Sequence, residues 1–369
     1  MKTFDVAIVG AGIVGAACAA ALTREGLKVI MLDSSSAASG TTAAGMGHIV
    51  VMDDSPAQLA LTAYSQKLWH ALAAELPPEC EFENCGTIWV AADDEEMQAV
   101  HAKKALYDNH SLDAKVLDAK ALCDAEPNLA KHLVGGLLVE SDAVVYQLAA
   151  TRYLLKKATD AGAEYRPFTK VSSISDSGVK VADGENISAG KIVNAAGADA
   201  QKLSPSLSIR GRKGHLVITD RYPGFVRHQL VELGYLKSAH GSDSSSVAFN
   251  VQPRRTGQIL LGSSRQFDVD DGSVDNDILR RMTSRGFQYI PALKDMSAVR
   301  VWTGFRPATP DNLPYIGKIP GFENVYAAAG HEGLGITTSL ATAELLTDEI
   351  VGRDSAIPRD SYAASRSTA

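Results

Sequence analysis

The sequence predicts a mixed α/β protein: a Rossmann-like domain that binds a dinucleotide, with an inserted substrate domain built on an antiparallel sheet. Glycine-rich turns directly follow strand-like segments near residues 10, 197 and 333. Further strand-like segments, two of them joined by a hairpin loop, lie between the last two turns. A chain of 369 residues is long enough for about two domains. The turns therefore predict one domain assembled from three pieces of the chain and interrupted twice by the other.

The composition is that of a globular protein without a basic surface. Hydrophobic residues make up 45% and charged residues 21% of the chain, and 36 Lys and Arg against 43 Asp and Glu leave a net charge of −7. This balance argues against nucleic acid or an anionic membrane surface as a partner. Because no signal peptide and no apolar run of about 18 residues is recognisable, we expect a cytoplasmic protein without a membrane span. The four cysteines lack zinc spacing, so we expect unpaired thiols and no metal site.

The N-terminal segment has the pattern of a βαβ unit, with a strand at residues 4–9, a helix at 13–22 and a second strand at 28–33. Gly10, Gly12 and Gly15 form a GxGxxG turn between strand and helix, which allows a pyrophosphate to approach the backbone and the helix N-terminus. Asp33 ends the second strand, where a carboxylate binds a ribose and disfavours the 2′-phosphate of NADP. The segment therefore predicts an adenine dinucleotide, without separating NAD from FAD.

A loop and a helix follow. Residues 39–47 contain too few large side chains to form a core element. Ser55 as N-cap and Pro56 at the first helical position then begin a helix that ends before Pro77. Four leucines at helical spacing fall on one face of this helix: Leu61, Leu68, Leu72 and Leu76.

The remaining elements follow from strand-like runs, apolar periodicity and turn residues. We expect strands at residues 85–91, 191–195, 215–219, 246–251, 258–262, 299–303 and 325–329, helices at 93–108 and 337–350, and a helix–strand unit over 147–168. In the last helix Leu340, Ala343, Leu346 and Ile350 should face inward. The residues after Pro358 are small and polar and should form a loose tail.

Two later glycine turns bear on which dinucleotide is bound. The first, NAAGA at residues 194–198, is either a cofactor-facing turn at a strand end or a plain packing corner. The second, AGHEGLGITT at residues 329–338, leads directly into the C-terminal helix. The N-terminus of that helix would stabilise the negative charge of a reduced flavin, which favours FAD over NAD. The alternative is a capped helix start with glycines for packing.

Taken together, the motifs resemble those of a known family. They occur in the order GAGIVG and Asp33 at residues 10–33, SGTTAAGM at 39–46, NAAGA at 194–198, GFRPATPDNLPYIG at 304–317 and AAGHEGLGIT at 328–337. Over nearly the whole chain this combination resembles the glycine oxidase/D-amino-acid oxidase (DAO) family of FAD-dependent amine oxidoreductases. Sarcosine oxidases and the flavin subunits of opine and D-hydroxyproline dehydrogenases belong to the same group.

The resemblance implies an FAD-binding domain over residues 1–80, 142–212 and 300–369, and a substrate domain over residues 81–141 and 213–299. It also implies non-covalent FAD, because no cysteine lies where covalently flavinylated sarcosine oxidases carry theirs. The residues to which it assigns cofactor binding are Gly10, Gly12, Ile13, Val14, Gly15, Asp33, Ser34, Thr41, Thr42, Gly45, Met46, Val171, Ala196, Gly197, Gly333, Leu334, Gly335, Ile336 and Thr337. Val171 should meet the adenine, and the last five should surround the carbonyl edge of the flavin.

Arg306, within GFRPATPD, resembles the family arginine that binds the substrate carboxylate. A guanidinium fork pairs both carboxylate oxygens and fixes the Cα hydrogen over flavin N5. The alternative is an arginine that bridges to Asp311. His48 would accept a proton from the amine or tune the flavin, or it is a hydrogen-bonded loop residue. His331 and Glu332 would face the substrate, or they serve structural hydrogen bonds.

The sequence departs from the glycine oxidase pattern at two pocket positions. Asn250 stands where the pattern has a tyrosine, and Gly333 where it has a second arginine. Both changes put glycine itself in doubt as the substrate and favour an N-substituted glycine such as iminodiacetate, or an opine-type substrate. A second acidic arm would need another cation on the inserted sheet. Candidates are Lys237, Arg254 and Arg265, each of which is otherwise an ordinary sheet-edge charge.

The resemblance implies oxidation of the Cα–N bond of a small amino acid by hydride transfer to flavin N5, followed by imine hydrolysis. Electrons would return to O2 and give H2O2. The alternative is a flavin subunit of a hetero-oligomeric opine or D-hydroxyproline dehydrogenase that passes electrons to a partner protein. A third interpretation is a non-catalytic FAD-binding module, against which Arg306 in its motif argues. The sequence does not give the oligomeric state, although homo-oligomers are common.

Overall fold

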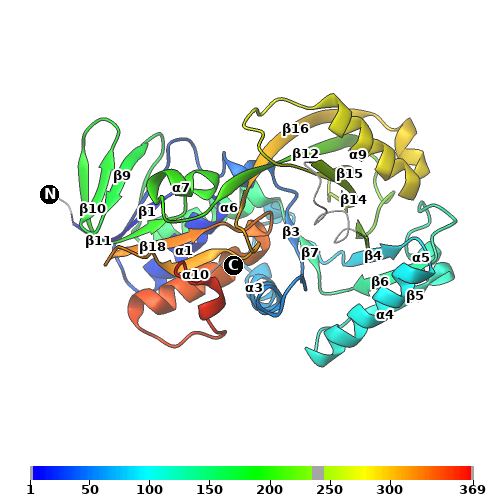
Figure 1. Ribbon diagram of the computed structural model, residues 1–369, viewed down its shortest axis with the longest axis horizontal. Helices are drawn as coiled ribbons and strands as arrows, with labels where there is room; N and C mark the ends of the chain where they lie inside the picture. Colours follow the sequence, from blue (N-terminus) through cyan, green and yellow to red (C-terminus); the bar gives the residue numbers. More distant parts are fainter. Residues whose placement is uncertain (1–2, 235–244, 367–369) are drawn as a thin grey trace. The chain divides into compact units, whose positions relative to one another are not determined.

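The structure, a computed structural model, describes residues 3–234 and 245–366 of the chain (Figure 1). The chain divides into two compact units, each assembled from separate pieces. The first unit comprises Met1–Cys80, Val145–Gly211 and Phe305–Ala369, and the second comprises Glu81–Val144 and Arg212–Gly304. These bounds lie within five residues of those that we expect for the cofactor and substrate domains.

The first unit is built on a parallel sheet with the strand order β17-β18-β11-β1-β2-β8. Its strands are β1 (Phe4–Val9), β2 (Val29–Leu32), β8 (Glu164–Arg166), β11 (Asn186–Asn194), β17 (Tyr315–Lys318) and β18 (Val325–Ala329). Only the pairing of β17 with β18 along this order is antiparallel. The hairpin β9 (Val171–Ser175) and β10 (Gly178–Val181) pairs with β11. The expected Rossmann-like α/β fold is confirmed.

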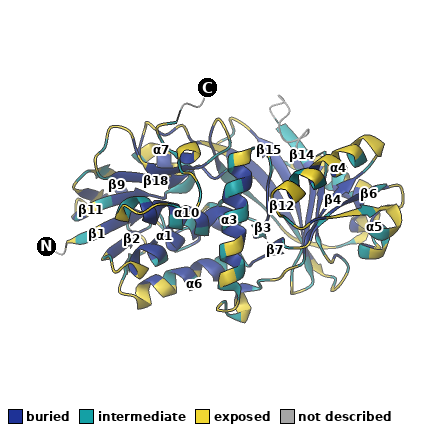
Figure 2. Cartoon of the chain, turned by 90° about the horizontal axis from the view of Figure 1, so that it is seen from below, coloured by how far each residue is buried: buried dark blue, intermediate teal, exposed yellow. Residues whose placement is uncertain are grey.

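Helices pack on this sheet and on one another. α1 (Ile13–Arg24) lies between α6 (Gln147–Asp160) and α10 (Gly335–Val351), and α10 packs against α3 (Pro56–Ala73). The small side chains of α1 let its neighbours approach closely, and Figure 2 shows its buried surface in dark blue against the exposed outer side of α6. The shorter elements are α2 (Thr41–Ala44), β3 (His48–Ile49), α7 (Ala200–Leu203) and 3₁₀ turns at Pro78–Cys80, Gly197–Asp199 and Asp360–Tyr362. The segment expected as a loop over residues 39–47 thus contains one helical turn.

The buried face of α3 is not the face that carries the four leucines. The helix begins as expected: the Ser55 hydroxyl accepts the N–H of Gln58 at 3.1 Å, and Pro56 is the first helical residue. Of the four leucines, however, only Leu61 is buried. The other buried positions of α3 are mostly polar: Gln58, Leu59, Thr62, Ser65, Gln66 and Trp69. Polar side chains can occupy a buried face where neighbouring backbone groups satisfy their hydrogen bonds, which an apolar pattern does not reveal.

The inward face of α10 is confirmed in part. Ala343 and Leu346 are buried as expected, whereas Leu340 and Ile350 are only half-buried. The helix ends at Gly352, whose left-handed conformation (φ +75°) closes the last turn.

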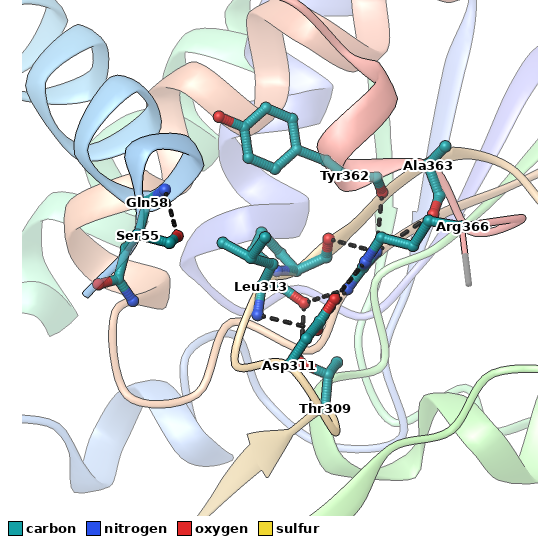
Figure 3. A network of polar contacts seen from close by, with 9 residues as sticks. Ser55, Gln58, Thr309, Asp311, Leu313, Tyr362, Ala363 and Arg366 are labelled. Carbon is teal, nitrogen blue, oxygen red and sulfur yellow. Dashed lines mark hydrogen bonds and ion pairs between the residues drawn. The ribbon is translucent and has the colours of Figure 1, made fainter. Parts of the chain in front are cut away.

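Residues 359–366 do not form the loose tail expected after Pro358, so for this part of the segment the prediction was wrong. Tyr362 is buried, and its hydroxyl donates to a backbone carbonyl of α3 at 2.6 Å. Arg366 pairs with both carboxylate oxygens of Asp311, at 2.7 and 2.8 Å, and donates to the carbonyl of Leu313 at 2.6 Å (Figure 3). Two polar side chains with long apolar bodies thus anchor a segment of small residues to the first unit.

The second unit is built on a mostly antiparallel sheet with the strand order β16-β12-β15-β14-β13-β4-β6-β5. Its strands are β4 (Thr87–Ala91), β5 (Lys115–Asp118), β6 (Gly135–Val139), β12 (Arg210–Arg221), β13 (Gln229–Glu232), β14 (Ser245–Pro253), β15 (Gln258–Gln266) and β16 (Ala298–Ala308). The pairing of β13 with β4 is parallel. β14 and β15 form the expected hairpin. Further elements are α4 (Asp94–Asn109), α5 (Ala119–Ala125), β7 (Ala143–Val144) and a 3₁₀ turn at Pro291–Asp295.

A helix that the sequence prediction missed, α9 (Asn276–Tyr289), covers this sheet. Its Met282 and Tyr289 belong to the core of the second unit, and the Tyr289 ring stacks on Phe249 of β14 at 4.3 Å between centroids. Asp275 caps the helix through the N–H groups of its first turn. The apolar core of the second unit thus lies between its sheet and α9.

Within the described residues, three general features bear on function. The four cysteines are unpaired, and burial raises the pKa of Cys18 to about 12 and that of Cys80 to about 11. In the same part of the chain, no group of three or more His, Cys, Asp or Glu side chains could hold a metal ion. No helix among these residues is long and apolar enough to cross a membrane.

Candidate active site

The GxGxxG turn has a backbone that only glycine tolerates at two positions. Gly10 has φ +109°, and a Cβ there would overlap the carbonyl oxygen of Ala195, just beyond β11. A Cβ on Gly15 would overlap the carbonyl oxygen of Gly10. Gly12 is the N-cap of α1 and has no side chain to cap it. The turn therefore packs closely against the sheet at the end of α1 where N–H groups lack intrahelical partners.

Two side chains from other segments hold this turn. Asp33, at the end of β2, accepts the N–H of Ala11 through Oδ2 at 2.6 Å and a second backbone N–H through Oδ1 at 2.8 Å. The hydroxyl of Thr42 accepts the N–H of Ile13 at 3.1 Å. A Cβ on Gly12 would lie only 3.2 Å from the same hydroxyl oxygen. The predicted acidic residue and the loop of residues 41–46 thus meet at the start of α1.

The same loop connects the turn to the other predicted motifs. Thr41 donates a hydrogen bond to the carbonyl of Phe305 at 2.9 Å. A Cβ on Gly197, which has φ +58°, would lie 3.8 Å from the Thr41 hydroxyl oxygen. A Cβ on Gly45 would lie 2.7 Å from Cδ1 of Ile336, in the first turn of α10. The first unit therefore brings together motifs that are separated by up to about three hundred residues of sequence.

Arg306, near the end of β16, lies against the C-terminal glycine loop. Gly333 has φ +81°, and a Cβ on it would lie 3.1 Å from Cδ of Arg306. The neighbouring Glu332 donates its N–H to the carbonyl of Pro307 at 2.9 Å. Arg306 itself is half-buried. Both oxygens of Asp311, the alternative partner of Arg306, pair with Arg366.

A family model described as DAO, FAD dependent oxidoreductase, matches residues 5–349 of the chain. This chain belongs to the DAO family of FAD dependent oxidoreductases. The resemblance inferred from the motifs is therefore confirmed, and so is FAD as the cofactor.

Named proteins that resemble this DAO-family chain include both oxidases and a synthase subunit. Hydrogen cyanide synthase subunit HcnC of Pseudomonas aeruginosa is 26% identical over 410 residues, which cover 97% of this chain and 94% of HcnC. The crystal structure of glycine oxidase from Geobacillus kaustophilus has a TM-score of 0.89 at 25% identity and covers 100% of both chains. The crystal structure of iminodiacetate oxidase from Chelativorans sp. BNC1 has a TM-score of 0.83 at 22% identity, covers 97% of this chain and 98% of its own, and shares the fold.

The residues of this DAO-family protein fit FAD. The missing Cβ of Gly12 leaves a space beside Thr42 that a side chain would fill. The N–H groups at the start of α1 suit a pyrophosphate, and the half-buried Asp33 carboxylate suits a ribose. At the other end of the site, α10 begins at Gly335 after Leu334, and no side chain of that N-cap closes the helix start. The N-termini of two helices, one preceded by Gly12 and the other beginning at Gly335, are thus available to one dinucleotide.

The other predicted cofactor residues lie in varied surroundings. Met46 and Val171 are buried, Val14 and Ala196 are half-buried, and Ser34 is exposed. Val171 begins β9, on the opposite side of β10 from β11. Contact of these residues with FAD stays a prediction.

The two histidines of the predicted site differ in their surroundings. His331 is buried, and its Nε2 lies 3.0 Å from the hydroxyl of Thr342 on α10. Burial lowers the pKa of His331 to about 3, so its ring is neutral at physiological pH. His48 is half-buried, and its carbonyl accepts a hydrogen bond from Thr337 at 2.8 Å. The bond to Thr342 favours the structural alternative for His331, whereas a substrate contact of either ring stays a prediction.

Asn250 and Arg265 lie in strands of the second unit, and Arg254 directly follows β14. Asn250 in β14 is opposite Gly262 of β15, and its side chain is nearly buried. Arg254 forms an ion pair with Glu81 at 2.7 Å, so its charge is already compensated. Arg265 in β15 is also buried. Lys237 lies outside the described residues.

Residues that the sequence prediction missed hold both the helix start and the arginine segment. On α3, Ser65 and Trp69 contact the first turn of α10 through hydrogen bonds. Arg366 binds the segment that follows Arg306. The spacing of Ser65 and Trp69, four residues apart on one helix face, is the sequence signal that could have identified the first pair.

Proposed function

We propose that this enzyme oxidises the Cα–N bond of a small amino acid and passes the electrons to O2, which is released as H2O2. The substrate is glycine, an N-substituted glycine such as sarcosine or iminodiacetate, or a D-amino acid. The observation that carries the proposal is the packing of the Arg306 side chain on Gly333, directly before α10. A guanidinium at this position lies beside the helix start that suits the flavin.

Each part of the site has a distinct task in this reaction. Bound FAD supplies the hydride acceptor. Arg306 pairs with both oxygens of the substrate carboxylate and thereby orients the Cα hydrogen. The substrate nitrogen loses a proton as Cα loses a hydride, and water hydrolyses the imine to an oxoacid and an amine. No triad of acid–base groups is required, because orientation and exclusion of water carry most of the catalysis.

The glycine at position 333 also bears on the choice of substrate. A Cβ there would lie only 3.1 Å from the Arg306 stem, so the glycine is what lets Arg306 pack directly on this loop. The iminodiacetate oxidase among the structural neighbours shares this fold. We therefore include amino acids with a second arm on nitrogen, for which Asn250 is a candidate contact.

A second candidate function is that of a flavin subunit that reduces a partner protein. HcnC, which this chain matches over 97% of its length, is named as a subunit of hydrogen cyanide synthase. In this case substrate oxidation is the same, but O2 is a poor acceptor and the partner binds near the flavin. The two functions share every residue named above and differ only in the fate of the electrons.

One experiment tests both candidates. The holoenzyme is mixed without oxygen with glycine, sarcosine, iminodiacetate, D-alanine or D-hydroxyproline, and bleaching of the flavin absorbance is followed. Air is then admitted and H2O2 is measured. Bleaching with stoichiometric H2O2 supports the oxidase, and bleaching without H2O2 supports the subunit. Bound FAD that none of the five compounds bleaches would contradict both.

Substitution of Arg306 tests the carboxylate contact. Arg306→Ala should raise KM by about a hundredfold, because two charge-assisted hydrogen bonds are lost. Arg300→Ala is the matched control, because Arg300 lies on the same strand, is exposed and packs over Trp302. An unchanged KM in Arg306→Ala would remove this residue from the site.

A further inference from the structure

Two buried side chains of α3 bind the backbone of α10 within its first turns. The Ser65 hydroxyl donates to the carbonyl of Thr337 at 2.5 Å and accepts the N–H of Ala341 at 3.2 Å. These two backbone groups are the pair that an i→i+4 hydrogen bond joins within a helix. Ser65 thus bridges one step of the hydrogen-bond ladder of α10 from a neighbouring helix. Side chains inserted in this way are a recognised cause of local helix distortion.

The indole of Trp69 binds the same turn. Its Nε1–H is shared between the carbonyls of Ile336 and Thr337, at 3.2 and 3.1 Å. Trp69 and Ser65 have no measurable exposed surface, so these hydrogen bonds lie away from water. Figure 2 shows α3 and α10 side by side within the first unit.

The contacted carbonyls control the direction of the N–H groups at the helix start. Each peptide group is planar, so the carbonyl of Ile336 and the N–H of Thr337 turn together. The first N–H groups of a helix have no intrahelical acceptor and point out of its N-terminus. A further bond, from the Thr337 hydroxyl to the carbonyl of His48 at 2.8 Å, fixes the same residue from the other side. The orientation of the Thr337 N–H is therefore imposed by Trp69 of α3 and by the segment at residue 48. Ser65 holds the next peptide group, whose N–H belongs to Thr338 and donates to the carbonyl of Leu334 at 2.8 Å.

We propose that Ser65 and Trp69 are positioning residues that tune the reduction potential of the bound flavin by fixing the first turn of α10. This rests on the proposed function, in which residues 333–337 surround the carbonyl edge of the flavin. Reduced flavin carries negative charge at that edge, and oriented N–H groups stabilise it. The hydrogen bonds from Ser65 and Trp69 also reduce the negative partial charge of the carbonyls that they contact. Without these bonds, the carbonyl oxygens would repel the negative charge of the reduced flavin.

The test measures the two-electron reduction equilibrium of FAD in Ser65→Ala and Trp69→Phe holoenzymes against a reference dye. Each variant should shift the equilibrium toward oxidised FAD by about three- to tenfold, the size of a charge–dipole effect at a partly buried helix end. Thr347→Ala is the matched control, because Thr347 is a buried polar residue of α10 more than two turns further along and its hydroxyl has no partner among the described residues. The control should change the equilibrium less than about twofold.

Thermal unfolding separates tuning from simple loss of structure. If either α3 variant retains FAD, unfolds near the control and leaves the equilibrium unchanged, the proposal is overturned. An equal shift in Thr347→Ala overturns it as well. If Trp69→Phe does not fold, the test rests on Ser65→Ala alone. This substitution removes a single oxygen atom and should leave the fold intact. Failure of the proposed function has a different signature: Arg306→Ala then leaves KM unchanged, whatever the α3 variants do to the flavin.

Discussion

The two helices that begin beside glycine in the first unit, α1 and α10, are held at their N-termini by different means. At α1, Asp33 and Thr42 bind the backbone directly, and both belong to motifs that lie within about thirty residues of the turn. At α10, Ser65 and Trp69 bind the first turns from a helix some 270 residues earlier in the chain. One helix start is built from its own motif, and the other is supported by a distant helix.

This difference suggests a division of labour between the two ends of the cofactor site. At the α1 end, the backbone packs so closely at Gly10 and Gly15 that an added methyl group would overlap neighbouring atoms. Such a rigid turn suits tight binding of a pyrophosphate. The α10 end has side chains that adjust peptide orientation, which suits control of the flavin and of the substrate arginine. Variants at α1 should therefore change FAD affinity, whereas variants around α10 should change potential, pH response or stability.

The largest effect should come from Gly15→Ala. The added Cβ would overlap the carbonyl oxygen of Gly10, so the turn must open. Overpacking of this kind costs about 3 kcal/mol, which corresponds to roughly a hundredfold loss of FAD affinity. Gly40→Ala is the control, since no atom lies within 4 Å of a Cβ built there. Titration of the two apoproteins with FAD measures both affinities. Equal affinities would show that the turn before α1 can widen without loss of FAD binding, which would contradict the prediction.

The next effect is a pH dependence specific to the α10 end. The pKa of His331 is lowered by burial to about 3, so the unfolded chain binds a proton below pH 6.5 that the native protein does not bind. Stability should therefore fall as pH decreases from 6.5 toward 3, by up to about 1.4 kcal/mol per pH unit. Urea unfolding between pH 4.5 and 7 measures the slope. His331→Asn should have a smaller slope than the parent, whereas the exposed His101→Asn on α4 should keep the full slope.

A smaller effect is expected from Arg366, which supports the segment after Arg306. Arg366→Ala removes a nearly buried guanidinium from Asp311 and leaves that carboxylate without its bidentate partner (Figure 3). The expected loss of stability is about 2 kcal/mol. Arg353→Ala removes two more exposed ion pairs, with Glu25 and Asp348, and should cost much less stability, because solvent screens exposed charges. Thermal unfolding compares the two, and equal losses would show that the C-terminal anchor is only a surface contact.

The same contrast explains how much of this protein could be predicted from sequence. The βαβ unit, Asp33 and the order of the glycine motifs could be predicted because each rests on residues near one another in the chain. The buried face of α3 could not, because Ser65 is buried through hydrogen bonds to the backbone of α10, and Thr62 accepts the N–H of Met52 from the segment before the helix. Arg366 escaped prediction for the same reason, since its partner Asp311 lies 55 residues earlier in the chain.

The smallest effect, Asp33→Asn, separates the two ends most clearly. An amide can keep one acceptor for the N–H of Ala11, now 2.6 Å from Oδ2, but it presents a weaker acceptor to a ribose hydroxyl. FAD affinity should fall about fivefold, close to 1 kcal/mol, with no change in the reduction equilibrium of the bound flavin. Ser65→Ala should do the reverse and shift the equilibrium at nearly constant affinity. FAD affinity and the reduction equilibrium are therefore measured on both Asp33→Asn and Ser65→Ala. A shift in the potential of Asp33→Asn as large as in Ser65→Ala would mean that the two helix ends act on the cofactor as one unit.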